Sequence, residues 1–106
     1  MDRWDEEEQA VRGLLDRLEA DHVALTAASQ NSNADDEHDP EGATIAFERE
    51  QLAASIERTR RRLDDVVESR ALVASGRYGV CRTCGAAIAA GRLEARPHTR
   101  HCIDHA

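Results

Sequence analysis

Apolar residues recur at helical spacing in the first stretch of this chain. Over residues 2–28 no proline and only one glycine interrupts the sequence, and acidic residues crowd the opening turns, where the helix dipole favours negative charge. The apolar positions are Trp4, Val11, Leu14, Leu15, Leu18 and Leu25. Their intervals of three, four and seven residues predict an amphipathic α-helix of ~27 residues, about 40 Å long.

A second stretch of the same kind follows a polar segment. Asp39 before Pro40 is typical of a helix start, since Asp caps the first free N–H groups and Pro fits the first helical position. The helix should run to Ser75 and end at Gly76, because glycine readily adopts the left-handed conformation that terminates helices. Its apolar stripe comprises Ile45, Leu52, Ile56, Leu63, Val66 and Val73.

The connection between these two helices, residues 29–39, is short and polar throughout. Two amphipathic helices joined in this way can cover each other's apolar stripes by folding back. We therefore expect a mainly α fold in which residues 1–75 form an antiparallel coiled-coil hairpin within a monomer. The alternative is a dimeric coiled coil in which the stripes pair between chains.

Acidic residues gather at the expected tip of the hairpin, about residues 29–41. They are Asp35, Asp36, Glu37, Asp39 and Glu41. Three interpretations stay open from the sequence. The segment is a solvated loop, a cation site whose spacing differs from that of an EF-hand loop, or a set of carboxylates carried to a distant basic or metal-bearing site.

Two pairs of metal-ligating residue types close the chain, Cys81-Arg-Thr-Cys84 and Cys102-Ile-Asp-His105. Two soft ligands separated by two residues, repeated once, suit one tetrahedral zinc ion. Gly85 permits the sharp turn after the first pair. Because all four ligands come from protein, residues 76–106 are expected to form a zinc-finger module with a structural site. His101 and His98 are weaker candidates for the fourth ligand.

Composition narrows the function further. The chain has 106 residues, 33% of them charged, and a net charge of −7, which argues against binding along a nucleic-acid backbone. Residues 1–41 contain 13 acids and 3 Arg, whereas residues 42–106 contain 8 acids and 11 Arg. No apolar run suits a membrane span, and no signal-peptide core opens the sequence, so we expect a cytoplasmic protein. The sequence contains no arrangement of residues typical of a catalytic nucleophile and no glycine-rich phosphate loop, so we do not expect an enzyme.

The zinc-finger segment also carries a family resemblance. Tyr78-Gly79-Val80-Cys81-Arg-Thr-Cys84-Gly85, then Ile88, Arg92-Leu93-Glu94-Ala95-Arg96-Pro97 and Cys102-Ile103-Asp104-His105 resemble the DksA/TraR zinc-finger family. The resemblance is specific over residues 76–106, and the preceding hairpin agrees in architecture. It implies a bacterial transcription regulator that binds RNA polymerase directly, without binding DNA, and inserts a coiled coil into the secondary channel.

The resemblance also implies roles for individual residues. Cys81, Cys84, Cys102 and His105 would hold zinc, although the family often has Cys at the place of His105. The acidic tip would approach the polymerase active centre. Asp36 and Asp39 reproduce two aspartates of the family's tip, but Glu41 stands where the family commonly has alanine. Arg92 and Arg96 would contact a partner or the phosphates of guanosine tetraphosphate, or would brace the finger.

Three functions compete at this point. The first is the polymerase-binding regulator, for which an arginine cluster at residues 58–62 offers a further contact with an acidic rim. The second is a scaffold or interaction protein of the same fold with a different partner, because a fold does not determine function. The third is a DNA-binding zinc finger, which the net charge and the lack of a basic recognition helix disfavour.

Overall fold

Two long helices dominate the computed structural model, which describes residues 3–30 and 40–106. They are α1 (Arg3–Gln30) and α2 (Pro40–Ala74), and the short helix α3 (Ala90–Ala95) and the 3-10 turn η1 (Ile103–His105) follow them. The mainly helical class expected from the sequence is confirmed. Strand-like pairing in the described ranges is limited to one isolated antiparallel bridge, Val80 with Ala87.

The ends of both long helices follow local chemistry. α1 has Asp5 and Glu6 in its first turn and continues to Gln30, two residues beyond the expected end. α2 begins at Pro40, as expected, and ends at Ala74. Gly76 has a φ of 72°, and the N–H groups of Arg77 and Tyr78 both donate to the carbonyl of Leu72. The left-handed glycine thus ends α2 and lets the following residues cap its last turn.

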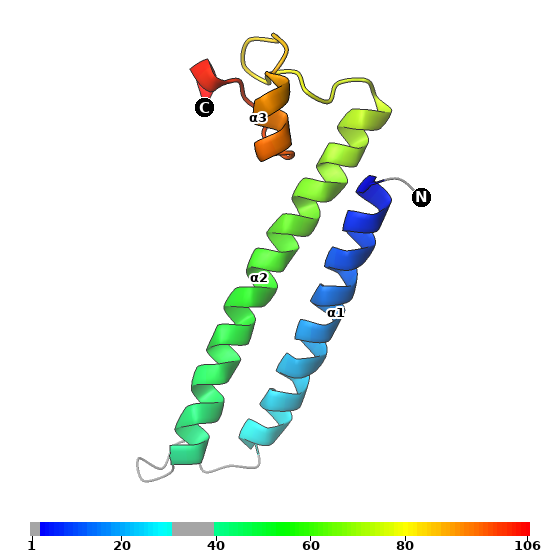
Figure 1. Ribbon diagram of the computed structural model, residues 1–106. Helices are drawn as coiled ribbons and strands as arrows, with labels where there is room; N and C mark the ends of the chain where they lie inside the picture. The colour runs from blue at the N-terminus through cyan, green and yellow to red at the C-terminus, as the bar shows by residue number, and fades with distance from the viewer. Residues whose placement is uncertain (1–2, 31–39) are drawn as a thin grey trace. The chain divides into compact units, whose positions relative to one another are not determined.

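The chain separates into two compact units, Met1–Leu63 and Asp64–Ala106. In the first unit, α1 and the beginning of α2 run side by side (Figure 1). Arg49 Nη1 donates to Ser29 Oγ at 3.2 Å, and Arg60 Nη2 pairs with Glu19 Oε1 at 2.9 Å. Ser29 comes after Glu19 in α1, whereas its partner Arg49 comes before Arg60 in α2. The helices are therefore antiparallel, which confirms the predicted hairpin.

The interior of this hairpin is narrow. Val11 of α1 is buried, as are Ile56 and Thr59 of α2. The hydroxyl of Thr59 donates to the carbonyl of Ser55 at 2.7 Å, so its polar atom is satisfied within its own helix. A thin apolar seam with polar flanks is what two helices alone can bury. None of the helices in the described part of the chain has the length and apolar character to cross a membrane.

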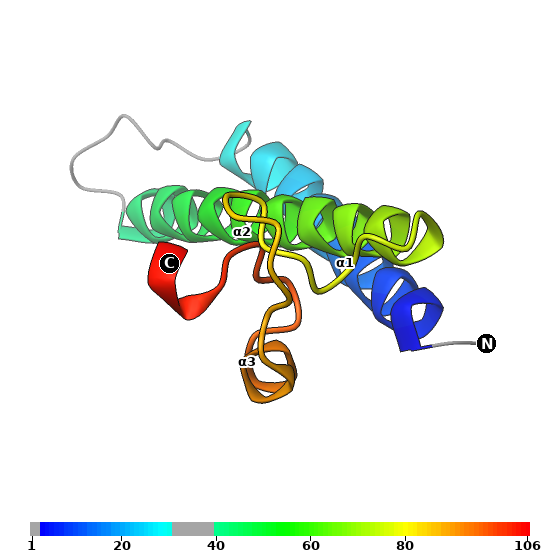
Figure 2. The same ribbon diagram turned by 90° about the horizontal axis from the view of Figure 1, so that it is seen from above.

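The second unit combines the last turns of α2 with the segment that follows. Figure 2 shows that this segment, yellow to red, is mostly loop, interrupted by α3 and η1. Its interior is formed by Val66 of α2 together with Cys81 and Ile88. Tyr78 donates its hydroxyl proton to the carbonyl of Pro97 at 2.9 Å. Val73, which we expected in the apolar stripe, is 44% exposed because the stripe ends with the last turn of α2.

Candidate metal centre

The first ligand pair lies on a tight turn of the backbone. The N–H of Cys81 donates to the carbonyl of Ala86, and the N–H of Gly85 donates back to the carbonyl of Cys81, at 2.8 and 2.9 Å. Gly85 has a φ of 74°, a conformation that residues with a side chain rarely adopt. This turn places the sulfurs of Cys81 and Cys84 on the same side of the loop, Cys81 buried and Cys84 exposed.

The second ligand pair is set by the turn η1. Cys102 is its N-cap residue, and the N–H of His105 donates to the carbonyl of Cys102 at 3.0 Å. Side chains three residues apart in a 3-10 turn lie one above the other. Cys102 and His105 therefore present their ligand atoms in the same direction.

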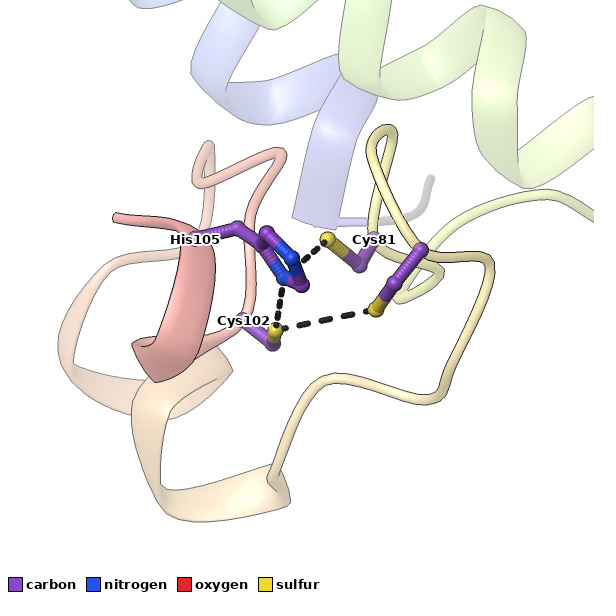
Figure 3. Close-up of side chains that lie close together, drawn as sticks. Cys81, Cys102 and His105 are labelled. Atoms are coloured by element: carbon purple, nitrogen blue, oxygen red, sulfur yellow. Dashed lines mark hydrogen bonds between the residues drawn. The ribbon is translucent and has the colours of Figure 1, made fainter.

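The four predicted ligands converge in the structure. One ligand atom from each of Cys81, Cys84, Cys102 and His105 lies within 4.8 Å of all the others. The sulfurs of Cys84 and Cys102 are 3.8 Å apart, and the Nδ1 atom of His105 is 3.2 Å from the sulfur of Cys102 and 4.0 Å from that of Cys81 (Figure 3). In a tetrahedral zinc site with bonds of about 2.0–2.3 Å, neighbouring ligand atoms are about 3.5–3.8 Å apart. The site thus has the dimensions of a zinc centre.

The electrostatics of the thiols also suit a cation. Backbone N–H groups of Cys102 and then Cys84 lower the pKa of the Cys81 thiol to about 5, against a usual value of 9.0. For Cys84, the Ala86 N–H lowers the thiol pKa, but the hydrogen bond with Cys81, desolvation and the nearby Cys102 together raise it. The lowered pKa of Cys81 favours the thiolate form, which is the form of cysteine that binds a metal ion.

The other two histidines of the module contact hydroxyl groups and are not part of the four-residue cluster. His101 places its Nδ1 atom 3.3 Å from the hydroxyl of Thr83, and His98 places its Nδ1 atom 2.7 Å from the hydroxyl of Ser69. His105 is the histidine that joins the three cysteines. The structure therefore favours the ligand set expected from the sequence over the weaker candidates.

The two candidate arginines of the module differ in their contacts. Arg92, in α3, donates from Nε to the carbonyl of His101 at 2.9 Å, which braces the segment before Cys102. Arg96, which follows α3, is exposed and lines the same surface hollow as Arg92. The hydrogen bond from Arg92 to the carbonyl of His101 is thus consistent with the bracing role considered from the sequence.

Most of the acidic tip lies outside the described residues. Asp35, Asp36, Glu37 and Asp39 belong to that segment, and their expected role stays a prediction. Glu41 is exposed in the first turn of α2.

A polar cluster that joins the zinc-finger segment to α2 was not predicted from the sequence. Ser69 of α2 is fully buried, and Arg100 donates from Nη2 to its hydroxyl at 3.0 Å. Glu68 pairs with both Arg82 and Arg100. The Arg100 guanidinium first, and then Arg82, hold the pKa of Glu68 below its usual value. No periodicity or motif spacing indicates such contacts, because their partners are distant in the sequence.

Comparison with known proteins identifies the module. Residues 76–104 match the family model described as the prokaryotic dksA/traR C4-type zinc finger. The chain carries a zinc finger of the DksA/TraR family. The match ends at Asp104, one residue before His105, so the position that distinguishes this DksA/TraR finger from a C4 set lies just outside it. Zinc is accordingly the cofactor of the module, and the four clustered residues are suited to one structural ion.

Two further similarities extend beyond the DksA/TraR finger. The chain is 33% identical over 96 residues to the uncharacterized protein YteA of Bacillus subtilis strain 168, covering 85% of this chain but 40% of YteA. The chain thus spans well under half the length of that curated relative. It is also similar to the structure of transcription factor DksA2 from Pseudomonas aeruginosa, with a TM-score of 0.59 and 24% identity, over 95% of this chain and 78% of the other. The second likeness shows that the DksA fold extends over nearly the whole chain.

Proposed function

We propose that the protein is a DksA/TraR-type transcription regulator that binds RNA polymerase directly. The observation that carries the proposal is the combination of a DksA/TraR zinc finger with a DksA-like fold over nearly the whole chain. The structurally similar DksA2 bears the description of a transcription factor, and the helical hairpin supplies a narrow element for insertion into a channel.

The metal has a structural role in this proposal. Cys81, Cys84, Cys102 and His105 hold one zinc ion and leave no coordination position open for water or substrate. Zinc bound there joins the two ends of the finger, which buries few apolar side chains of its own. The module thus serves as a folded base for the hairpin rather than as a catalytic centre.

The proposed mechanism is shape combined with electrostatics. The hairpin enters the secondary channel of the polymerase, and the carboxylates of residues 35–41 act on a metal-bearing, basic environment at its end. The exchange of the family's alanine for Glu41 adds a further negative charge to this tip. Arg58 and Arg62 of α2, which are exposed, offer contacts with an acidic rim.

Guanosine tetraphosphate is a weaker part of the proposal. Arg96 is exposed beside a surface hollow, where its guanidinium would meet a phosphate. Arg92 already donates to the carbonyl of His101, so its bracing role is the better supported one. A scaffold protein of the same fold with another partner remains the competing function.

The test is a binding and transcription experiment with purified bacterial RNA polymerase. We expect the wild-type protein to bind the polymerase and to change transcript yield. A variant carrying Asp36→Asn and Asp39→Asn should still bind but lose that change, because the tip acts after insertion. The matched control carries Glu48→Gln and Glu50→Gln, two exposed α2 positions with the same loss of charge.

Two outcomes contradict this proposal. If the wild-type protein and the polymerase do not associate in the defined mixture, the partner is wrong, and capture from cell extract would then identify the partner of a scaffold. If the control reduces the transcriptional effect as much as the tip variant does, the effect reflects overall charge rather than the tip.

A further inference from the structure

One arginine of the zinc finger is anchored almost entirely inside the second unit. The side chain of Arg100 is only 11% exposed, although it lies two residues from the ligand Cys102. Its Nη1 atom donates to the carbonyl of His98 at 2.7 Å and approaches that of Thr99 at 3.4 Å. Burying a charged guanidinium costs free energy unless hydrogen-bond or ion-pair partners surround it. The contacts of Nε and Nη2 therefore show which residues Arg100 stabilises.

Those nitrogens reach a single turn of α2. Nη2 of Arg100 donates to the hydroxyl of Ser69 at 3.0 Å and to the backbone carbonyl of Asp65 at 3.3 Å. Nε lies 3.1 Å from the carboxylate of Glu68 as an ion pair. One side chain thus contacts three residues that span about one turn of the helix.

The hydrogen bonds around Ser69 form a consistent chain of donors and acceptors. A guanidinium only donates, so the hydroxyl of Ser69 accepts from Arg100 and keeps its own proton to donate. The Nδ1 atom of His98 lies 2.7 Å from the same hydroxyl, within hydrogen-bond distance. The fully buried hydroxyl of Ser69 therefore has a polar partner on either side, Arg100 and His98.

The backbone of Arg100 joins this cluster to both ligand pairs. Its carbonyl accepts from the N–H of Arg82 at 2.8 Å, and Arg82 stands between Cys81 and Cys84. The side chain of Arg82 pairs with Glu68, the same carboxylate that faces Arg100. Both ligand-bearing segments are therefore attached to α2 through neighbouring arginines.

We propose that Arg100 is a positioning residue that couples zinc occupancy to the order of the last turns of α2, residues 64–74. Zinc bound by the four ligands fixes the backbone on either side of the bond between Arg82 and Arg100, and this fixes the guanidinium against Asp65 and Ser69. Without the metal the two ligand pairs lose their common centre. Ser69 then loses its donor, and the helix turn around it opens more often. The proposal rests on the proposed zinc ligands and not on polymerase binding.

Hydrogen exchange read by mass spectrometry on the whole chain tests this coupling. In the wild-type protein, peptides within residues 64–74 should exchange on the order of tenfold faster after zinc is removed by a chelator. With zinc bound, Arg100→Gln should exchange there at the rate of the zinc-free wild type. The difference between zinc-bound and zinc-free protein should vanish in this variant. Arg77→Gln, at an exposed arginine outside the cluster, should keep the full difference.

A helix-side variant separates coupling from mere damage to the finger. Ser69→Ala leaves every residue of the finger unchanged, and coupling is reciprocal between linked sites. We therefore expect Ser69→Ala to weaken zinc binding in a chelator competition by the same factor by which it reduces the zinc-dependent protection of α2.

Three results would overturn the inference. The first is equal exchange of residues 64–74 in the wild type with and without zinc. The second is a full zinc-dependent difference retained in zinc-loaded Arg100→Gln. If Arg100→Gln fails to take up zinc, the Ser69→Ala variant provides the test. The third contradicting result is a Ser69→Ala variant whose zinc affinity and zinc-dependent exchange both equal those of the wild type. A wild-type protein that binds no zinc at all would instead refute the ligand assignment, which the metal content reports separately.

Discussion

His105 distinguishes the metal centre of this chain from a four-cysteine finger. A neutral imidazole in place of a thiolate leaves three negative ligands around a doubly charged ion, so the site carries one negative charge instead of two. The ring presents Nδ1 to the sulfurs of Cys81 and Cys102. The short 3-10 turn supplies this orientation, because it stacks His105 over Cys102.

Replacement of His105 tests the ligand assignment. His105→Ala should weaken zinc binding at least a hundredfold in a competition with a chromogenic chelator, since it removes one of four direct ligands, a larger loss than changes outside the ligand shell cause. His101→Ala is the matched control, because His101 faces Thr83 and should leave the affinity nearly unchanged. Equal losses in the two variants would contradict the assignment.

The spacing of ligand residues was readable from the sequence, whereas the cluster around Arg100 was not. The two Cys-based pairs have a fixed spacing that the geometry of zinc imposes. The bond between Ser69 and His98 joins positions 29 residues apart, and Ser69 looks like an ordinary polar helix position in the sequence. Buried polar contacts of this kind depend on where a loop returns to a helix, which no local pattern encodes.

At the level of elements, the apolar repeat predicted both long helices and their pairing. The start at Pro40 and the terminating role of Gly76 followed from side-chain chemistry and φ preference. The predicted end of α1 was two residues too early, because small and polar residues such as those after Ala28 are found both in the last turn of a helix and in the loop that follows. The extent of burial was less predictable, since the exposed Val73 belongs to the same repeat as the buried Val66.

The thin seam of the hairpin makes each buried apolar residue important. Ile56 is 8% exposed, so Ile56→Ala should lower the free energy of unfolding by about 2–5 kcal/mol. Val23→Ala, at a position 68% exposed on α1, should change it by less than about 0.5 kcal/mol. Urea denaturation followed by far-ultraviolet circular dichroism measures both. Similar losses in the two variants would mean that the helices do not pack through this seam.

At the level of the whole molecule, charge is distributed unevenly along the chain. The first 41 residues are strongly acidic and the remainder is mildly basic. The whole chain has a net charge of −7. All 14 basic residues are arginines, several of which are engaged in the contacts of the finger. The division expected from the sequence, after residue 75, stays a prediction, and the compact units of the structure are Met1–Leu63 and Asp64–Ala106. The Arg100 cluster accounts for this grouping, because it attaches the finger to Asp65, Glu68 and Ser69.

The overall charge predicts that the protein does not bind DNA. Fluorescence anisotropy with a labelled duplex should show no association at low or physiological salt, because an acidic chain releases no counterions from the phosphates. A positively charged DNA-binding zinc finger is the positive control. Binding that weakens steeply as salt rises would contradict this expectation and favour a nucleic-acid partner.

The surface around Cys84 determines how the metal is exchanged. Cys84 and Cys102 line a hollow of about 460 Å³, whereas Cys81 is buried. If zinc is held by the four ligands, a thiol or chelator would reach the Cys84 side of the site before the buried Cys81. Zinc held there would then be expected to exchange at a rate set by the concentration and size of the attacking molecule, without unfolding of the protein.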